Sequence, residues 1–370
     1  MIITYGIKDL QRILNIVNPS FGAVREEGFD FREIMPKAYS DGADLLKYHY
    51  IASDGDVDVA TAGNIPMQIN VGKSSYQCSF LGSVATLPQY EGKGYMRMLM
   101  QTIEQDDIAF GKDFSLLTGA RGRYARYGYT KVYNGYSFTF DEYYFKHIPK
   151  NQDITIREYN GEIDTLYNIY TATQPLLLRT KDDILQCLEM SRSKVRLIEH
   201  KGNIVGYYAF CTRKKVYLPE FAITDYSLAP SVMREIFDFE KVASFSVWVN
   251  PLDTKLASVL DAVCEDACLQ DELQIRVYNL CAFIKMLVEL NVEKCIISGE
   301  NATDSVVVDG NRYDISIENS LVCVDCNRID EQGLSVNEFL RSAINKPLTC
   351  LKKTKGIFPL AFGISLPDCF

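Results

Sequence analysis

The chain of 370 residues contains little histidine and tryptophan, and it has neither a dense Lys/Arg run nor a long apolar run. Its three histidines, His49, His147 and His200, are isolated, so no metal site is expected. The net charge of −9 repels nucleic-acid phosphates and excludes nucleic acid as a partner. No apolar run reaches the length of a membrane span. The acidic balance suits a cationic substrate, and it suits plain solubility equally well.

The cysteines do not form the pattern of a disulfide framework. Eleven of them, an odd number, are scattered along the chain, which favours reduced thiols and a cytoplasmic protein. The N-terminus also lacks the basic start and cleavage site of a secretory signal. Cys323 and Cys326 form a CxxC within an alternating strand pattern, where side chains three apart point to opposite faces and do not share a metal. Cys264 and Cys268 fit one face of a helix expected over 253–268.

Hydrophobic periodicity divides the chain into three segments of mixed α and β structure, 1–150, 151–270 and 271–370. The first reads as two helices, antiparallel strands that include 44–53, a strand–helix–strand crossover and a closing hairpin. The second repeats this order faintly. The third reads as a helix, an antiparallel sheet with a turn at Asp309-Gly310, and a helix over 335–344, before an apolar tail that is expected to be buried.

The stretch QYEGKGYMRMLM, residues 89–100, places two glycines where a strand gives way to an amphipathic helix. The N-terminus of a helix has unpaired N–H groups and attracts phosphate oxygens. Gly92 and Gly94 remove side chains from that contact and tolerate the backbone angles of an N–H nest. Their spacing differs from a dinucleotide fingerprint and from a P-loop. A simple tight turn is the alternative, but it does not explain why both glycines stand at the helix start.

The pattern Q-x-x-G-x-G after a strand reading SVATLP resembles the acetyl-CoA loop of the GCN5-related N-acetyltransferase (GNAT) superfamily. The resemblance implies that acetyl-CoA is the co-substrate. It also implies that strand backbone holds the pantetheine arm and that loop backbone holds the diphosphate. The strand residues are Val84, Ala85 and Thr86, and the loop residues are Gln89, Tyr90, Glu91, Gly92, Lys93, Gly94 and Tyr95.

The whole chain resembles the Eis-like (enhanced intracellular survival) acetyltransferases in length, in segment order and in the run YARYGY over 124–129. This resemblance implies tandem GNAT folds, active in 1–150 and degenerate in 151–270. It further implies a sterol-carrier-protein-like α/β domain over 271–370 and a homo-oligomer of three or six subunits. The central segment lacks the glycine pair, as a degenerate copy would.

In the Eis-like family a tyrosine before an Arg-aromatic-Gly-Tyr run donates a proton to the leaving thiolate, and here that residue is Tyr124. Tyr127 and Tyr129 lie close enough to be confused with it. The family uses its terminal carboxylate as base, which here belongs to Phe370, although a terminus that simply packs in a core is the alternative. Cys369 stands where the family often has an acidic residue.

The leading hypothesis is an N-acetyltransferase that acts on a primary amine of an aminoglycoside, a polyamine or a lysine-like acceptor. A non-catalytic protein that binds acyl-CoA or lipid is the alternative, and an oligomeric scaffold is a third. Glu26, Glu27 and Glu33 are candidate acids on the acceptor side, or else a solvated helix face.

Overall fold

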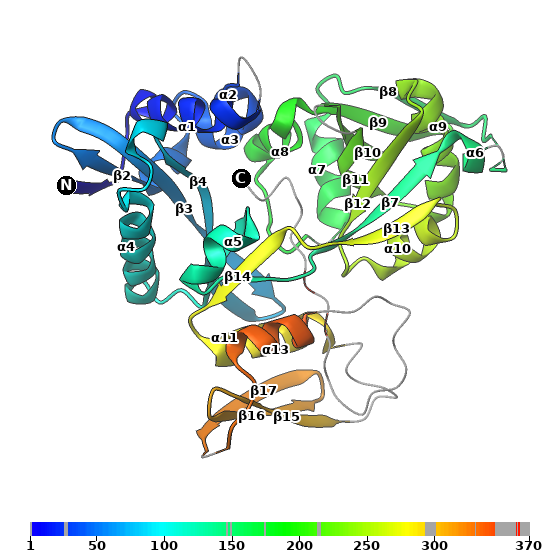
Figure 1. The fold of residues 1–370 in the computed structure, drawn as a ribbon. Helices are drawn as coiled ribbons and strands as arrows, with labels where there is room; N and C mark the ends of the chain where they lie inside the picture. The colour runs from blue at the N-terminus through cyan, green and yellow to red at the C-terminus, as the bar shows by residue number, and fades with distance from the viewer. Residues whose placement is uncertain are drawn as a thin grey trace. The chain divides into compact units, whose positions relative to one another are not determined.

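The computed structural model describes residues 2–25, 29–145, 147–148, 150–173, 175–212, 216–292, 301–329, 331–344, 360 and 362. The chain forms two compact units, and each unit is built from stretches that are separated in the sequence (Figure 1). Unit 1 contains Met1–Phe29, Leu45–Asn134 and Asp271–Phe362, and unit 2 contains Asp30–Asp44 and Gly135–Gln270. No described helix is long and apolar enough to cross a membrane.

A seven-stranded sheet with the order β1-β2-β3-β4-β5-β14-β6 forms the centre of unit 1 among the described residues. β4 and β5 are parallel, and the chain between them forms helix α4. The strand expected over 44–53 begins at His49, because Asp44–Tyr48 is a 3-10 helix. The strands are β1 (Ile2–Tyr5), β2 (His49–Asp54), β3 (Val57–Val71), β4 (Ser74–Thr86), β5 (Phe114–Thr118), β14 (Leu273–Val277) and β6 (Thr130–Lys131).

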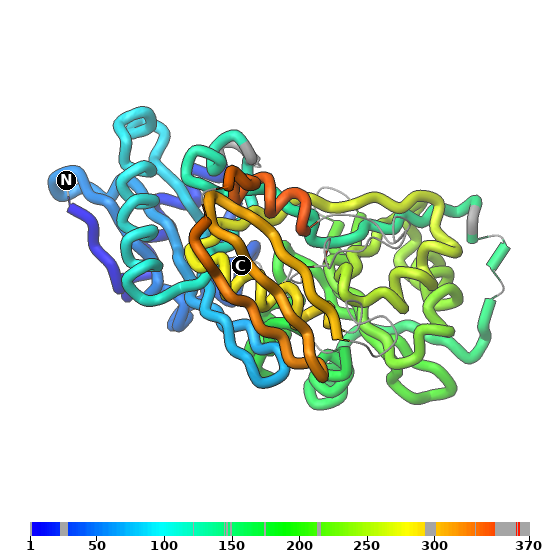
Figure 2. Tube along the Cα trace, turned by 90° about the horizontal axis from the view of Figure 1, so that it is seen from below, coloured from blue at the N-terminus to red at the C-terminus, as the bar shows by residue number. Residues whose placement is uncertain are grey.

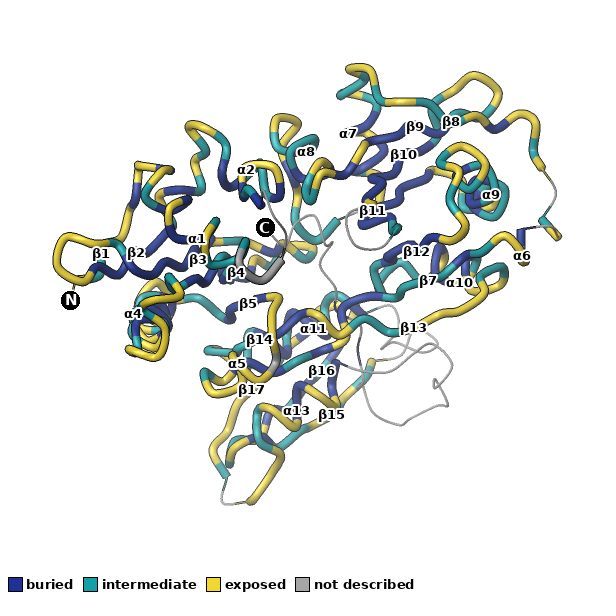
Figure 3. The backbone as a smooth tube through the Cα atoms, turned by 45° about the horizontal axis from the view of Figure 1, so that its top comes forward, coloured by how far each residue is buried: buried dark blue, intermediate teal, exposed yellow. Residues whose placement is uncertain are grey.

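The helices of unit 1 bury one face against this sheet. Ile13, Ile16 and Val17 of α1 are fully buried, as their spacing predicts. In α4, Leu99, Met100 and Ile103 are buried while the opposite face is exposed, and Figure 3 shows this alternation along the helix. The helices are α1 (Leu10–Arg25), η1 (Asp44–Tyr48), η2 (Pro88–Tyr90), α4 (Tyr95–Ala109), α5 (Arg121–Tyr124), η3 (Ala125–Tyr127), α11 (Leu280–Leu290) and α13 (Val336–Ala343).

A second sheet in unit 1 confirms the hairpins that the third segment predicts. Its strands β15 (Ala302–Val308), β16 (Asn311–Glu318) and β17 (Leu321–Arg328) pair in that order, and they lie side by side in Figure 2. Asp309 and Gly310 form the expected turn with φ of 46° and 74°. Ser335 caps α13 through a capping box with Glu338. The strand expected over 294–300 lies outside the described residues.

Unit 2 is built on another seven-stranded sheet, in the order β13-β7-β12-β11-β10-β9-β8. β11 and β12 are parallel, with helix α9 between them in sequence, so the strand–helix–strand crossover of unit 1 occurs a second time. The elements are α2 (Phe31–Ile34), α3 (Pro36–Tyr39), β7 (Gly135–Asp141), α6 (Glu142–Phe145), β8 (Ile154–Glu158), α7 (Ile163–Ala172), α8 (Lys181–Leu188), η4 (Met190–Arg192), β9 (Lys194–His200), β10 (Asn203–Cys211), β11 (Tyr217–Ile223), η5 (Tyr226–Leu228), α9 (Ala229–Glu240), β12 (Ser244–Val249), α10 (Thr254–Asp261) and β13 (Asp266–Gln270).

Two strands pair far from their sequence neighbours. β7, expected to close a hairpin in the first segment, pairs with β12 and β13 in unit 2. β14 enters the sheet of unit 1 between β5 and β6. The helix expected over 253–268 is wrong in its second half, because α10 ends at Asp261 and Cys268 lies on the edge strand β13. Cys264 and Cys268 therefore do not share a helix face.

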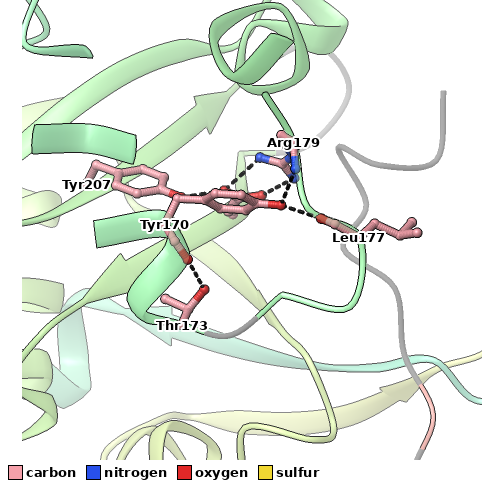
Figure 4. A network of polar contacts seen from close by, with 6 residues as sticks. Tyr170, Thr173, Leu177, Arg179 and Tyr207 are labelled. Carbon is pink, nitrogen blue, oxygen red and sulfur yellow. Dashed lines mark hydrogen bonds and ion pairs between the residues drawn. The ribbon is translucent and has the colours of Figure 1, made fainter. Parts of the chain in front are cut away.

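A buried ion pair holds the connection between α7 and α8 in unit 2 (Figure 4). The Arg179 guanidinium donates two hydrogen bonds to the Glu220 carboxylate, at 3.0 and 2.7 Å. Tyr207 donates a third to the same carboxylate at 2.6 Å, and the Tyr170 ring lies 4.8 Å from the guanidinium carbon. Tyr170 also donates to Leu177 O. These bonds compensate the cost of burying two charges, so the network fixes one arrangement of this connection.

Candidate active site

The glycine loop has the backbone conformation that an anion cradle needs. Gly92 and Gly94 have φ of 77° and 89°, in the left-handed region where a side chain is strained. Gly94 is the N-cap of α4 and offers no capping side chain, so the first-turn N–H groups of this helix gain no partner from it. A Cβ built on Gly92 meets no atom within 4 Å. Open space and the helix N–H groups thus meet at the positively polarised end of α4.

β4 separates from β5 just before this loop. The two strands pair only from Cys78 to Leu81 on the β4 side. Ser83 then has a φ of 50°, unusual for a residue other than glycine, and the register with β3 shifts between Thr61 and Gly63. This combination is a β-bulge, which inserts one residue and reverses the alternation of the strand. The end of β4 therefore presents a main-chain edge that β5 does not cover.

The alternation beyond the bulge decides which main-chain groups face that edge. Leu87 N donates to a carbonyl of β3 at 2.9 Å, and successive residues of an antiparallel strand turn their N–H and C=O groups to alternate sides. The main-chain groups of Val84 and Thr86 therefore point away from β3, whereas those of Ala85 point toward it. Ser20 Oγ donates to Thr86 O at 3.0 Å. Val84 and Thr86 are thus oriented to pair with an extended ligand, and Ala85 contributes only its side chain.

One cleft of about 930 Å³ joins the β4 edge to the glycine loop. The cleft brings together most of the residues predicted for the donor, but Gln89 and Lys93 are not part of its lining. Lys93 Nζ instead lies 4.6 Å from the centre of the Tyr90 ring, in a cation–π contact. The predicted residues along the cleft are Val84, Ala85, Thr86, Tyr90, Glu91, Gly92, Gly94 and Tyr95.

The three neighbouring tyrosines after β5 have different surroundings. Tyr127 lines the cleft. Tyr129 is buried, and its hydroxyl lies 2.8 Å from Ser115 Oγ. Tyr124 is 6% exposed, and its ring packs against Gly119 so closely that a Cβ there would lie 2.7 Å from it. Burial raises the pKa of the Tyr124 phenol, and the Arg123 guanidinium, which hydrogen-bonds the phenol, opposes the rise. Tyr124 is therefore protonated at neutral pH, as a proton donor must be.

Sequence reasoning missed the arginines of this cleft. Arg97, Arg123 and Arg126 lie within or near the recognised motifs, but nothing in the motifs marks them as lining residues. Arg276 comes from β14, about 150 positions further along the chain. It forms an ion pair with Glu104 of α4 and donates to Tyr127 O at 2.6 Å. Only the pairing of β14 with β5 brings it here, and no local sequence pattern predicts that pairing.

Of the expected acceptor-side acids and the expected base, the structure describes only Glu33. Glu33 is exposed and its carboxylate lies 2.6 Å from the Arg192 guanidinium, so it forms a surface ion pair within unit 2. Glu26, Glu27 and Phe370 lie outside the described residues. Over the described ranges, no three His, Cys, Asp or Glu side chains gather to hold a metal ion. The buried Cys78 thiol on β4 has its pKa raised to about 12 by burial, so it is not a thiolate nucleophile.

Residues 2–132 match the family model described as an acetyltransferase (GNAT) domain. No curated protein sequence matches the chain. The family match confirms the enzyme class expected from the sequence, an N-acetyltransferase, and acetyltransferases of this type take the acetyl group from acetyl-CoA. The matched range ends after β6 and contains neither β14 nor residues 135–270 of unit 2, so it covers the glycine loop, the end of β4 and Tyr124 but not Arg276.

Solved structures similar to this chain extend over nearly its whole length. A probable N-acyltransferase from Enterococcus faecalis, a conserved protein of unknown function, is 15% identical with a TM-score of 0.64, over 88% of this chain and 85% of that chain. A GCN5-related N-acetyltransferase from Anabaena variabilis is 16% identical with a TM-score of 0.65, over 92% and 88%. Eis1 from Mycobacterium abscessus is 13% identical with a TM-score of 0.57, over 92% and 88%. At these identities the likeness shows a shared mixed α/β fold.

Proposed function

We propose that the protein transfers an acetyl group from acetyl-CoA to the primary amine of an aminoglycoside, a polyamine or a lysine-like acceptor. The observation that carries the proposal is the cradle at Gly92 and Gly94, where open space and helix N–H groups meet beside the uncovered end of β4. A diphosphate fits the cradle because its oxygens accept from those N–H groups. An extended pantetheine arm fits the β4 edge, because the main-chain groups of Val84 and Thr86 face outward.

The proposed mechanism divides the reaction between Val84, which lines the cleft, Tyr124, which lies buried next to the lining residue Arg123, and Phe370. The outward N–H of Val84 is available to polarise the thioester carbonyl. The amine attacks this carbonyl carbon, the C–N bond forms, and the C–S bond breaks. The Tyr124 phenol gives its proton to the departing thiolate sulfur. By the Eis-like resemblance, the Phe370 carboxylate takes the proton that the attacking nitrogen loses. The high pKa of the Cys78 thiol supports direct attack rather than an acyl-cysteine on β4.

The same resemblance gives the finer architecture that we propose. The segment 151–270 is a degenerate GNAT copy, which α9 supports, since Pro230 near the start of this helix removes one N–H donor from the anion-binding end. The chain-wide fold likeness to Eis1 supports an Eis-like protein. The sterol-carrier-like domain of the third segment, the homo-oligomer of three or six subunits and the cytoplasmic location stay predictions of the sequence.

The test is a free-thiol release assay with acetyl-CoA and a panel of aminoglycosides, polyamines and lysine peptides. We expect turnover with at least one amine. Extending the chain beyond Phe370 by a few residues is expected to abolish turnover while CoA still binds, because the extension removes the terminal carboxylate. The matched control carries the same residues at the N-terminus and is expected to keep its activity.

One result would overturn the proposal, and another would change its mechanism. Absence of turnover with every amine, together with tight binding of lipid, would favour a non-catalytic acyl-CoA or lipid-binding protein. Full activity of the C-terminally extended chain would remove Phe370 from the mechanism while the transferase assignment stands.

A further inference from the structure

The cleft of unit 1 carries more positive charge than the diphosphate cradle uses. Four arginines, but only two carboxylates, Glu91 and Glu104, are among its lining residues, so positive charge exceeds negative charge by two. The chain as a whole has a net charge of −9. A local excess against that background attracts an anion. The main-chain N–H groups of the glycine loop already provide for one anion, so the arginines indicate a second.

Two of the four arginines already have partners. Arg276 forms an ion pair with Glu104 and donates to Tyr127 O at 2.6 Å. Burial raises the pKa of the Tyr124 phenol, and the adjacent Arg123 guanidinium opposes this rise. These contacts fix the wall of the cleft and the proposed acid. Arg276 therefore has little of its guanidinium left for a ligand, and Arg123 faces the proposed acid.

Arg97 and Arg126 remain. Both are exposed, and neither has a carboxylate within ion-pair distance in the part of the chain that the structure describes. Arg97 lies in the first turn of α4, and its Nη2 is 3.3 Å from the position of a Cβ on Gly94. Arg126 lies on η3, which ends at Gly128 with φ of 80° and is held by Arg276. One arginine thus flanks the diphosphate cradle, and the other extends from a fixed turn into the same cleft.

Coenzyme A has a second anionic group one ribose away from its diphosphate, the 3′-phosphate monoester, with a charge of roughly −1.5 to −2 at neutral pH. A guanidinium binds such a group with two parallel hydrogen bonds. We propose that Arg97 and Arg126 form the subsite for this 3′-phosphate, and that the enzyme therefore selects coenzyme A over dephospho-coenzyme A. The inference rests on the proposed function, since it assumes that the diphosphate occupies the glycine loop.

Titration calorimetry of the full chain with CoA and with dephospho-CoA tests the subsite. Hydrogen bonds to charged groups predict that CoA binds roughly tenfold to a hundredfold tighter than dephospho-CoA. Arg97→Gln and Arg126→Gln are each expected to weaken CoA by about fivefold or more, while the dissociation constant for dephospho-CoA hardly changes. In the double variant the two ligands are expected to bind within about twofold of one another, and the salt dependence of CoA binding should fall.

The control removes the same charge elsewhere in unit 1. Lys73→Gln lies in the exposed turn between β3 and β4 and is expected to leave the ratio of the two dissociation constants unchanged. Equal binding of CoA and dephospho-CoA by the wild-type chain would overturn the subsite while leaving the proposed transferase intact. Equal weakening of both ligands by the arginine variants would overturn it too. If neither ligand binds the wild-type chain, the proposed function itself fails.

Discussion

Replacing Gly92 by alanine separates the role of the glycine loop in folding from its role in binding. Alanine at a φ of 77° has the strain of the left-handed region, about 1–2 kcal/mol. Gly111, just beyond α4, has a φ of 67° and, like Gly92, no atom within 4 Å of a built Cβ. Gly111→Ala therefore has the same backbone cost in the same unit, at a position that the cleft does not include. The two variants form a matched pair.

Both variants are expected to lower the melting temperature by roughly 2–8 °C, from about 2–4 °C for each kcal/mol in a unit of this size. Only Gly92→Ala is expected to lose CoA affinity, by at least about tenfold or 1.4 kcal/mol. The reason is that the new methyl group enters the space where phosphate oxygens approach, and a relaxed φ turns the N–H groups of the nest apart. Thermal unfolding with and without CoA, together with calorimetry, measures both effects. Undiminished CoA binding by Gly92→Ala, or an equal loss in Gly111→Ala, would refute the cradle.

The remaining predictions concern single side chains. Tyr124→Phe is expected to lower kcat roughly 10²- to 10⁴-fold while the dissociation constant of CoA is kept. A larger loss in Tyr127→Phe would transfer the acid role to Tyr127, which lines the cleft. Burial lowers the pKa of His49 from 6.5 to about 4. Because this folded-state value lies below the unfolded one, its contribution to stability is present above pH 6.5 and is lost as pH falls toward 4, by about 3 kcal/mol. In His49→Gln the stability difference between pH 7 and pH 4 should shrink by that amount in urea denaturation. If His49→Gln has the same difference in unfolding free energy between pH 7 and pH 4 as the wild-type chain, the lowered pKa of His49 is contradicted.

Local signals predicted much of the fold. The turn at Asp309-Gly310 lies where Gly follows a polar residue between two alternating runs, and both of its residues adopt positive φ. Ser335 and Glu338 form the capping box that defines the start of α13. The glycine loop is also predictable from local sequence. A left-handed backbone conformation before a helix favours glycine, and the glycines are visible in the sequence.

Other elements had no local signal. β13 is an edge strand whose first three residues are exposed, so it lacks the apolar alternation that identifies a half-buried strand, and its sequence reads equally well as the end of a helix. β7 shows the alternation, but its partners β12 and β13 both lie more than 100 residues further along the chain. Periodicity predicts that a strand exists and which face is buried. It does not predict which strand pairs with it, because many strands offer similar main-chain hydrogen-bonding groups and similar apolar faces.

The candidate active site also depends on a strand pairing that the sequence does not predict. The family match ends at residue 132, yet the sheet of unit 1 places β14 between β5 and β6, the two strands that flank Tyr124 in sequence. Arg276 of β14 holds the carbonyl of Tyr127 and pairs with Glu104, so the turn that presents Arg126 is attached both to its own sheet and to α4. The residues that carry the motif thus form the proposed cradle for the diphosphate. The wall that faces it depends on a strand from the other end of the chain. Residues 2–132 thus contain the proposed acid and the glycine loop, but not Arg276, which fixes the carbonyl of Tyr127 next to them.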